Sequence, residues 1–167
     1  MSKLKKSRAK ARRPARTPTA FDVFAVIERR RRADRSSQPL TPERQGNVCI
    51  AYHQAIDAMI GGYAEEYHLD TIIYALGIGV VLADTGLGAE HVELLRAAMA
   101  GAARTKDRYL AGGRIGLDGD ALAAIRAAYE LHQEQIRVAT LGELEAAIAE
   151  MHRRVAETNL GPEETFA

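Results

Sequence analysis

The chain has 167 residues, of which 47% are hydrophobic and 5% aromatic, with a single Cys. This length and composition suit one domain with a sizeable core, and one Cys excludes an internal disulfide, so we expect a reducing compartment, the cytoplasm of a bacterium. The net charge of +1 hides a strong polarity. Residues 1–40 hold 13 Lys and Arg against 3 acids, giving +10, whereas residues 41–167 hold 10 against 19, giving −9. A basic arm is therefore predicted to precede an acidic body.

The N-terminal segment is predicted to lack a fold of its own. Residues 1–18 contain eight Lys and Arg, no acid and one Leu. Such a segment cannot bury enough apolar surface to offset the entropy cost of ordering its backbone, so we expect it to be disordered when free. Residues 20–35 then predict a short amphipathic helix, in which Phe21, Phe24 and Ile27 share one face.

The rest of the chain predicts five longer helices with clear start signals. Thr41 can cap the first of them, with Pro42 at its first helical position. Asp118 is placed to cap the fourth, and Thr140 with Glu143 forms a capping box at the start of the fifth. The predicted helices cover approximately residues 42–60, 65–84, 92–111, 119–139 and 141–160.

The second of these helices contains the most apolar stretch of the chain, residues 69–83. A helix that is apolar on every side is typical of the middle of a bundle. Ala75, Gly79 and Ala83 lie four residues apart and offer a small-residue face that a neighbouring helix can approach closely. Only 13 residues separate its two nearest acids, fewer than the roughly 20 of a membrane span. Gly77-Ile78-Gly79 lacks the third Gly of a nucleotide-binding turn, so a core helix fits best.

These helices predict an all-α protein, an antiparallel bundle of about five helices with a disordered basic arm. The predicted parts are the arm with its short helix at 1–39, the bundle at 40–160 and an acidic tail at 161–167. Residues 36–39 are expected to be a linker. The apolar stripes of the last two helices could also form a dimer seam, so a homo-oligomer is possible.

The sequence contains no convincing catalytic constellation. Glu65 and His68 form one E-x-x-H step, whereas a carboxylate-bridged di-metal site needs two, so we interpret them as the first turn of a helix. His132 sits inside an apolar stripe and is expected to be a hydrogen-bonded core residue. Cys49 is expected to be a small buried hydrophobe. We therefore predict no enzymatic activity, no cofactor, no metal, no membrane association and no small-molecule substrate.

The basic arm suggests a partner. Cations spaced by small residues can follow a phosphate backbone without reading bases, so DNA is the predicted ligand. The last helix is net acidic and unsuited to enter a groove. Two alternatives remain open: an arm that is merely solvated or folds back on the acidic body, and a helical adaptor with no nucleic-acid role. The candidate phosphate contacts are Lys3, Lys5, Lys6, Arg8, Lys10, Arg12, Arg13, Arg16, Arg29, Arg30, Arg31 and Arg32.

Three stretches of the body carry a resemblance to known proteins: LTPERQGNVCIAYHQAI (Leu40–Ile56), GRIGLDGDALAAIRAAYELHQEQIRVAT (Gly113–Thr140) and MHRRV (Met151–Val155). In them the chain resembles small helical bacterial proteins that occur around mobile elements and are often labelled Fis-family transcriptional regulators. The resemblance covers roughly residues 40–157, and it implies DNA binding and transcription control. It carries no functional residue over to this sequence, whose acidic last helix departs from a basic recognition helix.

Overall fold

The computed structural model describes residues 20–159, which form six α-helices and one short 3-10 helix and contain no β-strand. The all-α prediction is therefore confirmed. By contacts the chain divides into two compact units, residues 1–33 and 34–167. The predicted disordered segment and the acidic tail lie outside the described residues. The elements are α1 (Ala20–Ser36), α2 (Pro42–Gly61), α3 (Glu66–Asp84), η1 (Ala89–His91), α4 (Val92–Leu110), α5 (Gly119–Val138) and α6 (Leu141–Asn159).

The helix starts follow the capping residues in the sequence. Thr41 accepts a hydrogen bond from the backbone of Arg44 at the start of α2, and Asp118 accepts one from Ala121 at 2.7 Å at the start of α5. Each of these oxygens satisfies a backbone N–H that has no partner inside the helix. At the other end of α2, Gly62 has a φ of 74°, a left-handed conformation that suits glycine.

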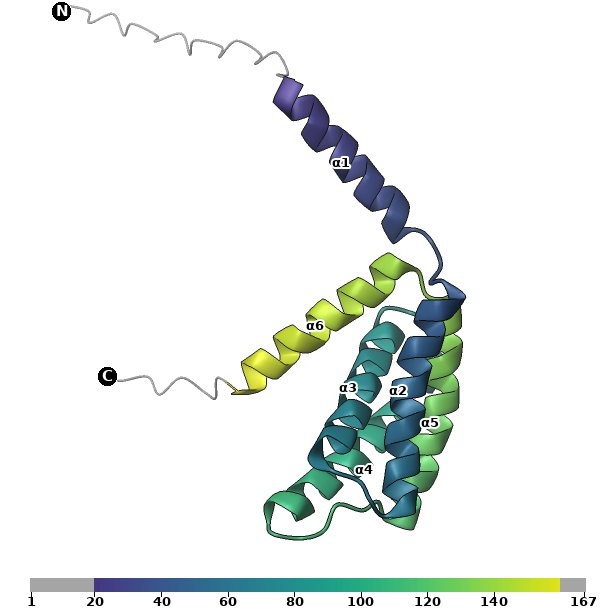
Figure 1. The fold of residues 1–167 in the computed structure, drawn as a ribbon, viewed down its shortest axis with the longest axis vertical. Coiled ribbons are helices and arrows are strands. Elements are labelled where there is room, and N and C mark those ends of the chain that lie inside the picture. The colour runs from purple at the N-terminus through teal and green to yellow at the C-terminus, as the bar shows by residue number, and fades with distance from the viewer. Residues whose placement is uncertain (1–19, 160–167) are drawn as a thin grey trace, which may run out of the picture. The chain divides into compact units, whose positions relative to one another are not determined.

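Helix α3 is the central element of the bundle. It packs against α2, α4, α5 and α6, and Figure 1 shows it running alongside α2. Leu69, Ile72 and Leu76 are fully buried. A Cβ atom added at Gly79 would lie 3.0 Å from the side chain of Leu95 and 3.2 Å from that of Gln135. The small-residue face therefore admits side chains from α4 and α5, as the four-residue spacing predicts.

The same helix, Glu66–Asp84, is the one described helix whose length and composition would allow it to cross a membrane. In its most apolar window 56% of the residues are buried inside the protein. Burial of this kind is typical of the core helix of a bundle.

The segment before α2, predicted to be only a linker, is hydrogen-bonded to the turn between α5 and α6. Pro39 and Thr140 form an isolated antiparallel bridge, and the backbone of Leu141 donates to the carbonyl of Gln38 at 2.9 Å. Leu40 is 4% exposed and belongs to the core. The body therefore includes these residues as an integral part of its packing.

Candidate functional site

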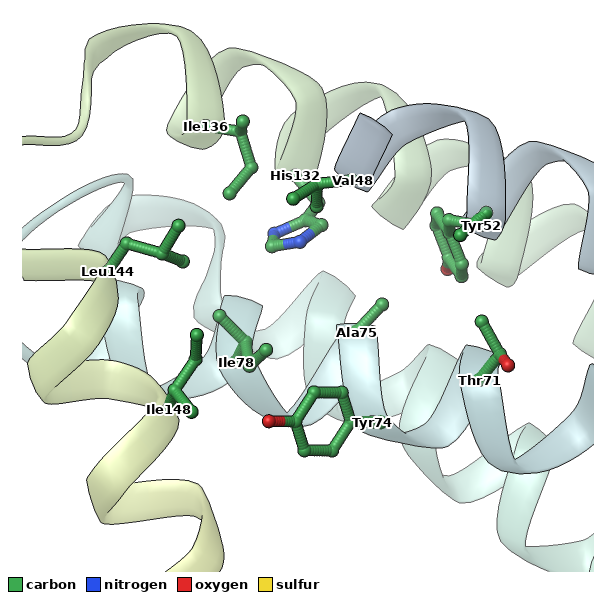
Figure 2. A pocket seen from close by; sticks show the side chains of 11 residues that line it. Val48, Tyr52, Thr71, Tyr74, Ala75, Ile78, His132, Ile136, Leu144 and Ile148 are labelled. Carbon is green, nitrogen blue, oxygen red and sulfur yellow. The ribbon is translucent and has the colours of Figure 1, made fainter. Parts of the chain in front are cut away.

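A partly open cavity of about 210 Å³ lies between α2, α3, α5 and α6. Figure 2 shows how the four helices contribute its walls, with the imidazole of His132 among aliphatic side chains. Most of the lining is apolar. The lining residues are Val48, Ala51, Tyr52, Thr71, Tyr74, Ala75, Ile78, His132, Ile136, Leu144 and Ile148.

Two of the four polar side chains that line the cavity are satisfied. The hydroxyl of Thr71 donates to the carbonyl of Tyr67 at 2.7 Å, one turn earlier in α3. The hydroxyl of Tyr74 lies 3.0 Å from Nε2 of His152 on α6. These two contacts account for both hydroxyl groups by interactions within the protein.

The other two polar side chains each have an atom without a partner. Tyr52 and His132 are 1% and 2% exposed, yet the Tyr52 hydroxyl and His132 Nε2 make no hydrogen bond. Their rings face each other edge to face, with centroids 6.3 Å apart. An unpaired buried polar group costs about 1–3 kcal/mol, so these two atoms reduce the stability of the folded protein.

The neighbouring amide fixes the tautomer of His132. Nε2 of Gln135 donates to the carbonyl of Gly79 at 3.0 Å and to that of Leu87 at 2.8 Å. Oε1 of Gln135 is therefore oriented towards Nδ1 of His132, 3.1 Å away. An amide oxygen can only accept, so Nδ1 carries the proton and Nε2 is the bare acceptor of a neutral imidazole.

Burial keeps both unpaired groups uncharged near neutral pH. Desolvation lowers the pKa of His132 below its ordinary value of 6.5, against the opposing effect of the Gln135 contact. Desolvation likewise raises the pKa of the Tyr52 hydroxyl well above its ordinary value of 10.0, with a smaller contribution from Tyr129. One neutral acceptor and one neutral hydroxyl are thus buried in the apolar packing beside the cavity.

The interpretation of His132 as a hydrogen-bonded core residue is confirmed for one of its two nitrogens. The sequence does not reveal the cavity or the part played by Tyr52, because it places this tyrosine only within the apolar stripe of α2. The only sequence feature that points to these two residues is that each, a tyrosine and a histidine, lies within the apolar stripe of its helix. Their juxtaposition follows from the packing of α2 against α5, which no local pattern specifies.

The remaining candidate residues have structural roles. His68 Nδ1 accepts from the backbone N–H of Glu65 at 3.0 Å, so the E-x-x-H step is the first turn of α3, as expected. Among residues 20–159, no group of three or more His, Cys, Asp or Glu is arranged to hold a metal. Cys49 is half-buried, and burial raises the pKa of its thiol, which favours the unreactive thiol over the thiolate.

The predicted phosphate contacts fall into two groups. Those of the arm, between residues 3 and 16, lie outside the described residues. The others, residues 29–32, form one run in the second half of α1, and the side chains of Arg30, Arg31 and Arg32 are exposed. Arg31 makes an i,i+3 ion pair with Glu28 at 3.3 Å, with both side chains largely solvated.

The arginines of the last helix are differently placed. Arg153 pairs with Glu150 at 2.7 Å and also contacts Glu157. Arg154 pairs with Glu150 at 2.8 Å and with Asp84 of α3 at 3.1 Å. The hydrogen bonds from these two arginines lower the pKa of Glu150 to about 2. Carboxylates therefore already neutralise both cations of α6.

Comparisons of the chain with protein-family models, with curated proteins and with solved structures found no match. No relative therefore assigns a role to the cavity or to the arginine run of α1. What points to function is the chemistry of these two features.

Proposed function

We propose that this protein is a non-enzymatic, nucleic-acid-associated protein of the bacterial cytoplasm, whose basic N-terminal region contacts phosphates while its acidic bundle mediates association. The supporting observation is the segregation of charge, +10 over residues 1–40 against −9 over residues 41–167, obtained from 13 and 10 cations against 3 and 19 acids. In α1, Arg30, Arg31 and Arg32 follow one another with exposed side chains. Consecutive cations of this kind suit a phosphate backbone.

The charge state of the body supports the same division. Arg153 and Arg154 are bound to carboxylates, and Lys106 lies 2.7 Å from Glu66 and 2.8 Å from Asp70. A body with a net charge of −9, in which these cations are neutralised, repels phosphate. In this proposal the arm and α1 make the contacts with nucleic acid. Those contacts do not depend on base sequence, because phosphates carry no sequence information.

The end of the body formed by the α2–α3 turn supports a role in association. Ile60, Tyr63 and Tyr67 are 48%, 65% and 60% exposed there. Large apolar and aromatic side chains exposed close together in the sequence favour contact with another protein or another copy. A regulatory role would combine this contact with nucleic-acid binding by the basic region.

The test is fluorescence anisotropy of a labelled DNA duplex with the full chain over a range of salt concentrations. Replacing Arg30, Arg31 and Arg32 together by Gln is expected to weaken binding at low salt. The slope of log K against log salt should also become shallower, by about 1 for each phosphate that is no longer neutralised. Replacing the arm cations Lys3, Lys5, Lys6, Arg8, Lys10, Arg12, Arg13 and Arg16 by Gln is expected to weaken binding further.

The matched control carries the same change of charge on the body, with Arg104, Arg126 and Arg137 replaced by Gln. These side chains are exposed on α4 and α5. Equal affinities for the control and the α1 variant would mean that net charge alone governs binding. Absence of binding by the unaltered chain at low salt would rule out the nucleic-acid role and leave the helical adaptor, which sedimentation of the Tyr63→Ser variant would then examine.

A further inference from the structure

The end of the body formed by residues 57–70, here called the α2–α3 end, is both acidic and aromatic. This segment contains four acids and no Lys or Arg. Lys106 of α4 pairs with two of the acids, Glu66 and Asp70, at 2.7 and 2.8 Å. One cation against four carboxylates leaves a formal net charge of −3. The side chains of Asp57, Glu66 and Asp70 are about half exposed, so these charges face solvent.

Two tyrosines of the α2–α3 end are held in place while their rings stay exposed. A Cβ atom added at Gly61 would overlap the ring of Tyr63, so the glycine lets this ring lie against the end of α2. The ring of Tyr67 stacks on that of His68, with centroids 3.8 Å apart, and His68 accepts from the backbone N–H of Glu65. Rings that are positioned before binding lose little conformational entropy when they contact a ligand.

Positioned tyrosine rings close to carboxylates suit a cationic partner. The face of an aromatic ring carries a negative potential that attracts Lys and Arg side chains. Carboxylates accept charge-assisted hydrogen bonds from the same side chains. A phosphate or an acidic protein surface would be repelled by the net charge. The partner that fits is therefore a polypeptide segment with several closely spaced cations.

The chain itself contains such a segment. Residues 1–18 hold eight Lys and Arg and no acid. The chain enters the core of the body at Leu40, next to the start of α2. The α2–α3 end lies at the other end of this 20-residue helix, about 30 Å away. The arm of a second copy meets this end without having to span that length.

We propose that the α2–α3 end is the docking site for the basic arm, residues 3–16, of another copy of this chain. Cations of the arm lie over the rings of Tyr63 and Tyr67 and pair with the carboxylates beside them. The contact is heterologous, because one copy supplies the arm and the other supplies the docking site. This inference rests on the association that is part of the proposed function and names its partner. The same cations contact phosphates in that proposal, so nucleic acid competes with the second copy for the arm.

The experiment is sedimentation velocity of the full chain over a range of protein concentrations, at low and at high salt. At low salt the sedimentation coefficient is expected to rise with concentration. At high salt it should return to the value of the monomer, because salt screens contacts between exposed charges. A chain that stays monomeric at every concentration at low salt would overturn the proposal.

Two variants each remove one half of the contact. The end variant replaces Tyr63 and Tyr67 by Ser, and the arm variant replaces the eight Lys and Arg of residues 3–16 by Gln. Each variant alone is expected to associate at least about tenfold more weakly than the parent. An equimolar mixture of the two should recover a one-to-one complex, since the first supplies an arm and the second a docking site. A mixture that stays monomeric would contradict docking between copies.

A third variant tests whether the position of the acids matters. It carries Asp57→Asn, Glu66→Gln and Asp70→Asn and should also associate about tenfold more weakly. The matched control makes the same change of charge elsewhere on the body, at exposed acids. These are Glu90, Glu130 and Glu145, each replaced by Gln. Equal weakening by the two sets would mean that net charge alone governs association, which overturns the site.

DNA binding by the end variant separates this inference from the proposed phosphate contacts. In the anisotropy assay the end variant should bind the duplex at least as tightly as the parent, because its arm is unaltered. Self-association without DNA binding would support this inference and remove the nucleic-acid role. DNA binding by a chain that remains monomeric would overturn this inference and leave the phosphate contacts in place.

Discussion

The side-chain amide of Gln135 joins α5 to the middle of α3 by donating a hydrogen bond to the carbonyl of Gly79 at 3.0 Å. The same nitrogen donates to Leu87 in the turn that follows α3, and the amide oxygen contacts His132. Gln135 is 2% exposed. One buried side chain therefore connects α3, the turn after it and the cavity wall.

Replacing Gln135 by Leu is expected to destabilise the protein by about 2–4 kcal/mol, because the Leu87 carbonyl and the His132 Nδ1 proton would both be left without a partner in the interior. The measurement is urea denaturation followed by circular dichroism. Gln54→Leu is the matched control on the exposed side of α2 and should change stability by no more than about 0.5 kcal/mol. Similar losses for the two variants would show that the Gln135 bonds contribute little.

Two glycines inside helices are expected to respond to alanine in opposite directions. Gly46 lies in α2 with nothing within 4 Å of an added Cβ, so Gly46→Ala should stabilise the protein by about 0.5–1 kcal/mol through helix propensity. An added Cβ at Gly79 meets Leu95 at 3.0 Å and His132 at 3.2 Å, so Gly79→Ala should destabilise it by about 1–3 kcal/mol. The measurement is thermal melting of both variants, which gives the two changes in stability. Stabilisation by Gly79→Ala would contradict close packing of α3.

Stability should fall as the solution becomes acidic. The pKa of His132 is lowered by burial in the folded state, so below its ordinary value of 6.5 the unfolded chain binds a proton that the native protein does not. The free energy of unfolding then decreases with falling pH by up to about 1.4 kcal/mol per pH unit.

The measurement is urea denaturation of the parent protein and of His132→Leu between neutral and mildly acidic pH. The Leu variant should lack this part of the slope, while His91→Gln, which alters an exposed histidine, should retain it. Parallel curves for the parent and the Leu variant would mean that His132 titrates normally in the native state.

The capping box at the start of α6 should contribute about 1 kcal/mol. The backbone N–H and hydroxyl of Thr140 both donate to Glu143 at 2.8 Å, and the N–H of Glu143 donates to the Thr140 hydroxyl at 3.2 Å. Thr140→Ala should lose this stabilisation and Thr140→Ser should recover most of it, as measured by thermal melting. An Ala variant as stable as the Ser variant would show that the box is dispensable.

The local features of this fold can be predicted from its sequence because each has a local cause. Thr41, Asp118 and Thr140 cap helices through side-chain oxygens that accept from the backbone N–H three residues ahead. The apolarity of α3 predicts its central position, since a helix without a polar face must be covered on all sides.

Long-range relationships are beyond such reasoning. The backbone bridge between Pro39 and Thr140 joins residues about a hundred positions apart. Nothing in the short polar segment around Pro39 predicts this bridge. The cavity depends likewise on how Tyr52 of α2 and His132 of α5 meet around α3. Hydrophobic periodicity identifies which face is buried, but it does not state which buried atoms lack partners.

The central position of α3 also affects the order in which the protein can fold during its synthesis. Of the helices that pack against it, only α2 precedes it along the chain, while α4, α5 and α6 emerge from the ribosome afterwards. Until those later helices are made, the most apolar stretch of the polypeptide has a single partner and is open to aggregation. Early release of the nascent chain after α3 would therefore yield a fragment that depends on chaperones to stay in solution.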